Sequence, residues 1–428
     1  MIVGAELAAR EAAVETLVLP SGLRVLVRPM EGYSSVHAIL AVRCGSADRF
    51  FTLNGESFRM PMGTAHYLEH KMFEDTDGDA FVKFAALGAD ANAYTAFDRT
   101  CYLFTATESI DESLNVLLEM AAHPYFTEQT IAKEQGIIGQ EIRMYEDSPD
   151  WRLYLETAKC LYHGHPIRED IAGTVESIAG ITPEQLYTCC RAFYRPENMV
   201  LAAAGKITKE QVVDACRRCG FYDAAPAVSA EKQPPEEPMT VLCREKRLSM
   251  PVSLPYFGVG FKEKPVAVSD LRTQMLYEFI GECISGGMSP LYRRLYDSGL
   301  INPGFDGGPV VGEGCTFFVF QGISEQPETV RDMLLEEIRS VREKGVDREI
   351  FSLCKKVKYG QLVQTLDSVS ASASMLADLA LVGGTLEEEV RLAASLTPEE
   401  ADALMQDLFS EERMSFAVIE PQEEEGEE

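Results

Sequence analysis

The alternation of hydrophobic and polar residues predicts strands and long helices in the first half of the chain. Short runs rich in Val, Ile and Leu are typical of strands, whereas apolar residues three and four apart indicate helices. The elements expected on this basis are strands at 23–29, 37–45 and within 91–107, and helices from Thr64, over 110–122 and over 127–162. Strands grouped with long helices, rather than strict alternation of the two, favour an α+β fold.

The second half follows a similar order of elements. A strand is expected at 255–261, a helix over 270–296, a strand at 316–324 and further helices from Glu328. Two halves with the same order of elements suggest that one structural unit is repeated along the chain.

A direct alignment supports this repeat. Residues 181–205 (ITPEQLYTCCRAFYRPENMVLAAAG) align without a gap to residues 396–420 (LTPEEADALMQDLFSEERMSFAVIE). In both segments a Thr-Pro-Glu sequence supplies a helix N-cap, an N1 proline and an acidic first turn. The chain is therefore predicted to contain two tandem, similar domains.

A change of composition marks the boundary between these domains. Residues 224–240 (AAPAVSAEKQPPEEPMT) contain four prolines and several charges without apolar periodicity, as linkers do. The predicted organisation is an N-terminal domain over 1–223, a linker over 224–240 and a C-terminal domain over 241–428.

Length and charge narrow the classes of function. A chain of 428 residues with 46% hydrophobic residues can bury a sizeable core. Its formal charge of −29 argues against binding to nucleic acid or to an anionic membrane surface. The same charge would attract a cationic peptide, or it serves solubility alone, and the sequence leaves both open. Without an export signal or an apolar run of membrane length, we expect a cytoplasmic protein with reduced cysteines.

The segment MGTAHYLEHKMF, residues 62–73, holds two of the six histidines. His66 and His70 are four residues apart, so on a helix both project from one face, with Glu69 beside them. Two imidazoles at this spacing can bind one metal ion, and Glu69 can take a proton from water. The pattern His-x-x-Glu-His is that of the inverzincin peptidases. A chain of this composition contains it by chance on the order of 0.01 times.

A third ligand is sought in the helical segment KEQGIIGQEIRMYED. Glu134 and Glu141 are seven residues apart, which is two helical turns, and lie among isoleucines. One of the two carboxylates could coordinate the metal while the other fixes the orientation of a ligand histidine. Two histidines and one carboxylate also occur at non-haem iron sites, but hydrolytic zinc fits this motif more naturally.

The quoted segments resemble a known family. GTAHYLEHKMFED, GADANAYTAFDRTCYLF, KEQGIIGQEI and FYRPENMVLAAAGKI are similar to successive blocks of the pitrilysin and insulinase family of zinc metallopeptidases, which includes the mitochondrial processing peptidase. The resemblance implies two domains that each have a mixed, mostly antiparallel sheet packed with helices. It covers residues 20–206 densely and the second half loosely.

The resemblance also assigns roles to residues of this chain. It implies that zinc is bound by His66, His70 and Glu141, that Glu69 is the catalytic base, and that Glu134 supports a ligand. It further implies that a strand holds a peptide substrate through residues Asn92, Ala93, Tyr94 and Thr95. An edge strand can pair with any extended peptide through its backbone.

A narrower resemblance concerns the longer segments DGDAFVKFAALGADANAYTAFDRTCYLF and GIIGQEIRMYEDSPDWRLY. These are similar to bacterial insulinase-like proteins associated with elongation factor P 5-aminopentanol modification, which typically have a sister protein. Family members of this length supply half of a complete enzyme, so the resemblance implies a peptidase of two chains. We expect a heterodimer with a homologous sister subunit, with a homodimer as the alternative.

The second half departs from the family pattern. Leu353 and Gly360 stand opposite Glu134 and Glu141, and no histidine follows His165, so the C-terminal domain is expected to lack metal ligands. The resemblance implies an Arg and a Tyr, seven apart, that bind the substrate carbonyl. Here Tyr296 occupies the expected Arg position and no Tyr lies seven residues further on. A non-catalytic subunit that retains the fold is therefore the competing hypothesis.

Overall fold

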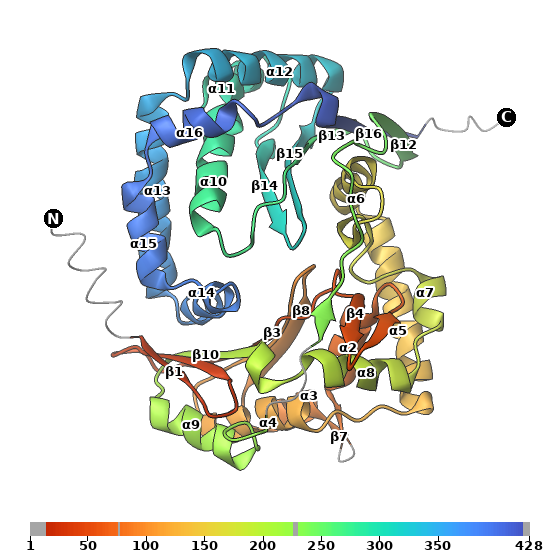
Figure 1. Ribbon diagram of the computed structural model, residues 1–428, viewed down its shortest axis with the longest axis vertical. Helices are drawn as coiled ribbons and strands as arrows, with labels where there is room; N and C mark the ends of the chain where they lie inside the picture. Colours follow the sequence, from red (N-terminus) through yellow and green to blue (C-terminus); the bar gives the residue numbers. More distant parts are fainter. Residues whose placement is uncertain (1–13, 76–77, 226–229, 423–428) are drawn as a thin grey trace. The chain divides into compact units, whose positions relative to one another are not determined.

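The computed structural model describes residues 14–75, 78–225 and 230–422 and divides into two compact units (Figure 1). Unit 1 takes the chain up to Ile142 together with 170–234 and 360–390. Unit 2 takes 143–169, 235–359 and the chain from Arg391. Each unit thus includes a segment from the other half of the sequence. The contiguous domains 1–223 and 241–428 remain predictions, and residues 226–229 of the predicted linker lie outside the described residues.

A six-stranded sheet forms the centre of the described part of unit 1. Its order is β1 (Glu15–Val18), β2 (Arg24–Pro29), β10 (Met199–Gly205), β3 (Val36–Val42), β9 (Thr100–Ala106) and β8 (Asp90–Thr95). β2 and β10 are parallel, and every other neighbouring pair is antiparallel. Smaller sheets join β11 (Glu231–Lys232), β4 (Phe50–Leu53) and β5 (Glu56–Arg59), and β6 (Glu74–Asp75) with β7 (Gly78–Asp79).

Helices cover both faces of this sheet. The helices with most of their residues in unit 1 are α2 (Thr64–Met72), α3 (Ala80–Ala86), α4 (Ile110–Ala122), α5 (Glu128–Glu146), α7 (Val175–Ala179), α8 (Pro183–Phe193), α9 (Lys209–Arg218) and α14 (Val369–Leu381). α14 packs on β10, β3 and β2, although it comes from the second half of the sequence. Arg28 on β2 fixes it by donating to the carbonyl oxygen of Leu366 (2.6 Å) and to Ser372 Oγ (2.8 Å).

Unit 2 repeats the sheet with one strand fewer among the described residues. Its order is β12 (Glu245–Met250), β16 (Met414–Pro421), β13 (Tyr256–Glu263), β15 (Cys315–Ile323) and β14 (Asp306–Gly312). β12 and β16 are parallel and the other pairs antiparallel, as for β2, β10, β3, β9 and β8 in unit 1. Two similar α/β units with mixed, mostly antiparallel sheets confirm the predicted fold class.

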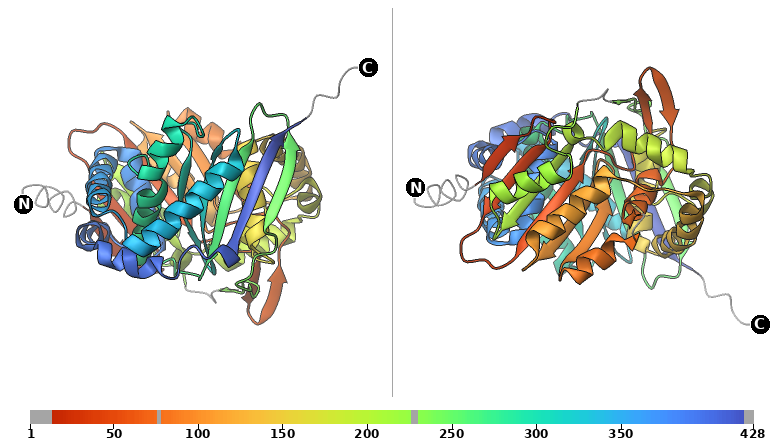
Figure 2. Two further views of the ribbon diagram at one scale, coloured as in Figure 1. Left: turned by 90° about the horizontal axis from the view of Figure 1, so that it is seen from above. Right: turned by 90° about the horizontal axis from the view of Figure 1, so that it is seen from below.

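The sheet of unit 2 is also covered on both faces. α6 (Pro149–Leu161), from the first half of the sequence, packs on β13 and β16. Figure 2 shows α10 (Leu271–Ser285) and α12 (Pro327–Lys344) over the other face. The remaining helices are α11 (Pro290–Asp297), α13 (Arg348–Asp367), α15 (Leu386–Ser395), α16 (Pro398–Met405) and the short 3-10 helices η1 (Pro166–Arg168), η2 (Pro196–Asn198) and η3 (Glu411–Arg413).

The aligned Thr-Pro-Glu segments begin equivalent helices. Thr182 caps α8 and Thr397 caps α16, each accepting a hydrogen bond from the backbone N–H three residues later. In both helices the N3 side chain accepts a hydrogen bond from the backbone N–H of the capping threonine, which completes a capping box. The strands that follow are β10 and β16, which occupy matching places in the two sheets. The predicted tandem repeat is therefore confirmed.

Three predicted elements are wrong in their extent. The helix expected over 127–162 ends at Glu146, because Ser148, which precedes Pro149, is extended with φ −86° and ψ 113°. The helix expected over 270–296 is interrupted at Gly286, which is also extended. The strand expected within 91–107 is the hairpin of β8 and β9, which turns where the N–H of Ala96 donates to the carbonyl of Arg99 (2.8 Å).

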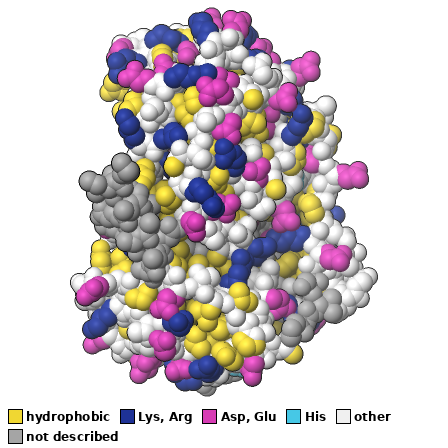
Figure 3. All heavy atoms as spheres, turned by 60° about the vertical axis from the view of Figure 1, so that its left-hand side comes forward, with side chains coloured by type: hydrophobic (Ala, Val, Ile, Leu, Met, Phe, Trp, Pro, Cys, Tyr) yellow, Lys and Arg dark blue, Asp and Glu magenta, His cyan; other side chains and the backbone are white. Residues whose placement is uncertain are grey.

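The surface of the protein carries both acidic and basic side chains. Figure 3 shows acidic and basic side chains interspersed on one face of the molecule. Among the described helices none alone is long and apolar enough to cross a membrane, although α14 and α15 pass that test together across a bend of 85°.

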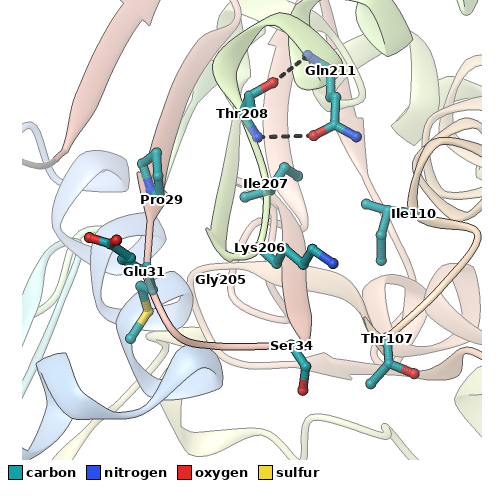
Figure 4. A pocket seen from close by; sticks show the side chains of 11 residues that line it. Pro29, Glu31, Ser34, Thr107, Ile110, Gly205, Lys206, Ile207, Thr208 and Gln211 are labelled. Carbon is teal, nitrogen blue, oxygen red and sulfur yellow. Dashed lines mark hydrogen bonds between the residues drawn. The ribbon is translucent and has the colours of Figure 1, made fainter.

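A hollow of about 660 Å³ lies in unit 1 where the parallel strands β2 and β10 end (Figure 4). Its lining includes Glu31, Ile110 and Lys206. Thr208 and Gln211 form a capping box at the start of α9. The backbone nitrogen of Thr208 lies 3.1 Å from Gln211 Oε1, and that of Gln211 lies 3.3 Å from Thr208 Oγ1. None of the residues predicted to carry chemistry lines this hollow.

A buried ion pair fixes the end of the predicted linker within unit 2. Lys262, whose side chain is 2% exposed, donates to Glu237 Oε1 (2.6 Å) and to the carbonyl oxygen of Leu161 (3.0 Å). The Glu237 carboxylate also accepts from the backbone N–H groups of residues 163–165 at 2.7 to 3.0 Å. The segment around Glu237 is thus part of the folded unit.

Replacement of Glu237 with Gln should destabilise the protein, because Lys262 would then be buried without a counter-charge. We expect a loss of about 3 kcal/mol in the free energy of unfolding, the range found when one partner of a buried pair is removed. Urea unfolding followed by circular dichroism measures it. Glu236 is exposed on the same segment, so E236Q should change the free energy by less than about 0.5 kcal/mol. Equal effects of the two variants would contradict the anchoring role.

Candidate metal centre

Helix α2 carries the motif His66-x-x-Glu69-His70 and is almost wholly buried. It begins after Gly63, which has φ 83° and lies so close to the neighbouring chain that a Cβ atom would stand 2.4 Å from the carbonyl oxygen of Ala172. Only glycine fits that combination of close approach and left-handed backbone. The sequence around Gly63 therefore fixes where α2 starts and which side chains it turns inward.

Helix α5 lies against α2 and supplies the two glutamates. Ile131, Ile138 and Ile142 on α5 are buried, and Glu134 is buried with them. The fully buried Tyr67 of α2 donates its hydroxyl proton to the carbonyl oxygen of Ile131 (2.5 Å). This hydrogen bond ties α5 to α2 beside the glutamates.

The side chains of α2 and α5 meet in one cluster. His66 Nε2 lies 3.5 Å from Glu141 Oε1, and His70 Nε2 lies 3.3 Å from Glu141 Oε2. One donor atom from each of these three residues lies within 4.8 Å of the others, which brings together the three predicted ligands. On the far side of the His70 ring, Nδ1 lies 3.1 Å from Glu134 Oε1.

The donor set fits a zinc ion. Two imidazole nitrogens and one carboxylate are the ligands of catalytic zinc, which keeps a fourth position open for water or substrate. Glu134 can accept the Nδ1 proton of His70, which leaves Nε2 of His70 unprotonated toward the cluster. His66 is 7% exposed, and its Nδ1 has no hydrogen-bond partner among the described residues. Of the two histidines predicted as ligands, Glu134 therefore contacts His70.

The titration of the metal-free cluster reflects its crowded carboxylates. Burial lowers the pKa of His70, but hydrogen bonds to Glu134 and Glu141 and the nearby Glu69 outweigh it and raise the value to about 9. The hydrogen bond from His70 holds the pKa of Glu134 below its usual range. Burial raises the pKa of Glu69, against the opposing effects of His66, Thr95 and His70. A raised pKa suits a group that must accept and later return a proton.

The four residues predicted to hold substrate lie on β8, the edge strand of the sheet, but their side chains divide between its two faces. Thr95 contacts Glu69 of α2, with 2.5 Å between the two oxygens. Tyr94 lies near Asp378 of α14 on the opposite face. Since side chains alternate along a strand, Ala93 shares the face of Thr95 and Asn92 that of Tyr94. The Asn92 side chain accepts from the N–H of Ala93 (2.8 Å).

The second half lacks an equivalent cluster in the described residues. The three-residue group of His66, His70 and Glu141 is the one that the described part of the chain offers for a metal. Leu353 and Gly360, which align with the two glutamates, lie on α13. Tyr296, at the expected Arg position, is 49% exposed on α11, where Arg294 pairs with Glu337 (2.7 Å). The expected Arg and Tyr pair is absent from that region of the sequence.

Comparison with known proteins identifies the family. The profile of the insulinase family, peptidase family M16, matches residues 56–175, and the profile of the M16 inactive domain matches residues 180–358. The uncharacterized zinc protease YmfH of Bacillus subtilis (strain 168) is 35% identical over 414 residues, which are 94% of this chain and 95% of that protein. The chain belongs to peptidase family M16. None of the predicted ligands lies within the residues that the inactive-domain profile matches.

Two solved structures share the fold of this chain. The crystal structure of an M16-like peptidase from Alicyclobacillus acidocaldarius has a TM-score of 0.92 and 33% sequence identity, covering 96% of this chain and 98% of that one. A protease from Helicobacter pylori has a TM-score of 0.82 at 18% identity, covering 95% and 99%, and shows the fold alone.

Two contacts of this M16 centre were missed from the sequence. Tyr67 contacts α5 and Thr95 contacts Glu69, whereas the sequence assigned no role to Tyr67 and predicted that Thr95 holds substrate. The position of Tyr67 between the two histidines gave no signal for its hydroxyl. The strict alternation of side chains along 92–95 could have separated Thr95 from its neighbour Tyr94.

Zinc uptake by the metal-free protein should depend on pH, because His70 must lose its proton to bind a metal. With a pKa of about 9, His70 is protonated at neutral pH. The apparent zinc affinity should therefore rise up to about tenfold per pH unit from neutral pH toward pH 9 and then level off. Zinc titration at several pH values, with proton release followed in weak buffer, measures this dependence.

The E134Q variant provides the matched control for this pH dependence. It removes a carboxylate that raises the pKa of His70, so its zinc affinity should vary less over the same range. The H70A variant should bind zinc much more weakly at every pH. A wild-type affinity that is flat from neutral pH to pH 9 would contradict the assignment of His70 as a ligand.

Proposed function

We propose that this M16 chain is a zinc-dependent metallopeptidase that hydrolyses peptides or small unfolded polypeptides. The observation that carries the proposal is the cluster of His66, His70 and Glu141, with Glu69 on the same buried helix as the two histidines. When bound there, zinc would lower the pKa of water and polarise the carbonyl of a peptide bond. A role in structure alone would need the metal ligands but not Glu69.

In this proposal Glu69 moves the protons of the reaction. It takes a proton from water as the water oxygen forms a bond to the peptide carbonyl carbon. It then gives that proton to the leaving nitrogen as the carbon–nitrogen bond breaks. Burial of Glu69, which is 8% exposed, raises its pKa and so makes its carboxylate a stronger base for the proton of water.

The neighbouring residues orient the reacting groups. Glu134 holds the ring of His70 through Nδ1, and the edge strand β8 offers backbone groups to an extended peptide. Ala93 and Thr95 face the helix that carries Glu69, so a peptide paired with β8 near these residues would lie beside the base. The negative charge of the chain would favour peptides with basic residues if it acts in binding at all.

We further propose that the chain is the catalytic subunit of a two-chain enzyme. The support is the absence from 285–305 of the Arg and Tyr pair that the family resemblance leads us to expect. A homologous sister subunit would supply that function and enclose the substrate, so that large folded proteins are excluded. A homodimer is the alternative.

A non-catalytic subunit that retains the fold is a second candidate function. The match of the M16 inactive-domain profile to residues 180–358 and the missing Arg and Tyr favour it. The presence of Glu69 together with the three potential metal ligands favours catalysis instead.

The proposal also concerns where the chain acts in the cell. It draws on the resemblance to proteins associated with elongation factor P 5-aminopentanol modification. We propose that the chain acts in the cytoplasm in association with that modification. This association rests on the similar segments at 77–104 and 136–154 and specifies no chemistry.

The E69Q variant should lose peptide cleavage and keep its metal. We expect kcat to fall roughly 10²-fold or more, because the amide cannot accept the proton from water. Zinc content measured by atomic emission should stay near that of the wild type, because Glu69 is not one of the three ligands. E128Q, on an exposed glutamate at the start of α5, is the control and should keep its activity. Full activity of E69Q would refute the assignment.

Peptidase activity should appear fully only when the chain is combined with its sister subunit. Size-exclusion chromatography should show a complex of the two proteins, and a digest of a peptide library followed by mass spectrometry should show more cleavage for the complex than for either chain. Undiminished cleavage by the chain alone, as a homodimer, would contradict the heterodimer.

A further inference from the structure

We propose that Thr95 is a positioning residue that holds the carboxylate of Glu69 in the orientation needed to accept a proton. The inference rests on the proposed peptidase function and adds a residue to it. It also changes the role expected for Thr95 from the sequence, which was to hold substrate.

The hydroxyl of Thr95 has one proton, and the local contacts direct it to Glu69. Thr95 Oγ1 donates to Glu69 Oε2 with 2.5 Å between the oxygens. The other hydroxyl nearby belongs to Thr100, 3.4 Å from Thr95 Oγ1. Thr100 donates its own proton to the carbonyl oxygen of Cys44 (2.8 Å). Because the carboxylate is the stronger acceptor and is the nearer of the two, Thr95 donates to Glu69 and not to Thr100.

The sheet fixes where this hydroxyl lies. Thr95 is the last residue of β8 and pairs with Thr100 of β9, directly before the turn in which Ala96 bonds to Arg99. A β-branched side chain in a strand has few accessible rotamers. Thr95 thus brings a donor of defined position to the carboxylate from a different element than the helix that carries Glu69.

The carboxylate of Glu69 requires such a donor. It is 8% exposed. His66 and His70 attract its negative charge, and Glu141 repels it. With Oε2 held by Thr95, Oε1 has no hydrogen bond to the described residues and remains available for water. Without the hydroxyl the carboxylate could rotate toward the histidines, and a displacement of about 1 Å can cost a hundredfold in rate.

The first test compares T95V with T95S. Valine keeps the branched shape and removes the hydroxyl, whereas serine keeps the hydroxyl. With a fluorogenic peptide, kcat of T95V should fall about tenfold or more, the value of a hydrogen bond to a charged group, with KM within about twofold. T95S should restore kcat to within about threefold of the wild type. T100V removes the neighbouring hydroxyl, which does not contact Glu69, and should change kcat far less.

Two kinetic outcomes would overturn the proposal. If T95V raises KM and leaves kcat unchanged, Thr95 binds substrate and does not position the base. If T95V and T100V lower kcat equally, the loss reflects disturbance of the β8–β9 hairpin and not the contact with Glu69.

A second test reads the contact without any activity. In the zinc-free protein, T95V should lower the urea midpoint of unfolding in the wild-type background and have a smaller effect in the E69A background. Equal shifts in the two backgrounds would overturn the contact. If the wild-type protein with its zinc and its sister subunit cleaves no peptide, the proposed function itself fails, whereas equal shifts in an active enzyme refute the role of Thr95 alone.

Discussion

Five ionisable side chains lie close together between α2 and α5, and the balance of their charges constrains the rest of unit 1. They are His66, Glu69, His70, Glu134 and Glu141. Glu69, Glu134 and Glu141 would repel one another if no positive charge lay between them, and burial makes that repulsion costly. In the metal-free protein the protonated His70 supplies the charge, which is why its pKa lies near 9. A divalent cation would supply more and would displace the proton. The cluster thus needs more positive charge than the protonated His70 provides.

Contacts with neighbouring elements hold these side chains in place. Tyr67 fastens α5 to α2, Gly63 sets the start of α2, and Thr95 reaches Glu69 from the sheet. Each contact comes from a different element, so the cluster depends on the packing of the whole unit and not on one helix. The second unit has the same strand order without these residues, which shows that the fold and the chemistry are separable.

Much of this could be predicted from the sequence because it depends on local rules. The start of α2 at Thr64, the threonine caps of α8 and α16, and the equivalence of β10 and β16 follow from periodicity and capping. The approach of Glu141 to the histidines was not local, and it followed from helical spacing together with the family resemblance. The break at Ser148 was missed although Pro149 signals it, because the apolar pattern continues through it. The partner of Thr95 depends on how β8 meets α2, which no local pattern specifies.

The exchange of helices between the two halves has a consequence for the order of folding. The sheet of unit 1 is covered on one face by α14, which ends at Leu381, while its last central strand, β10, ends at Gly205. A ribosome must therefore add more than a third of the chain after the strands of that sheet are complete before its second face can be covered. During synthesis the apolar face over β2, β3 and β10 would stay exposed to solvent or to a chaperone. The candidate metal centre, in contrast, is encoded wholly before Ile142, so its helices can meet long before the sheet behind them is closed.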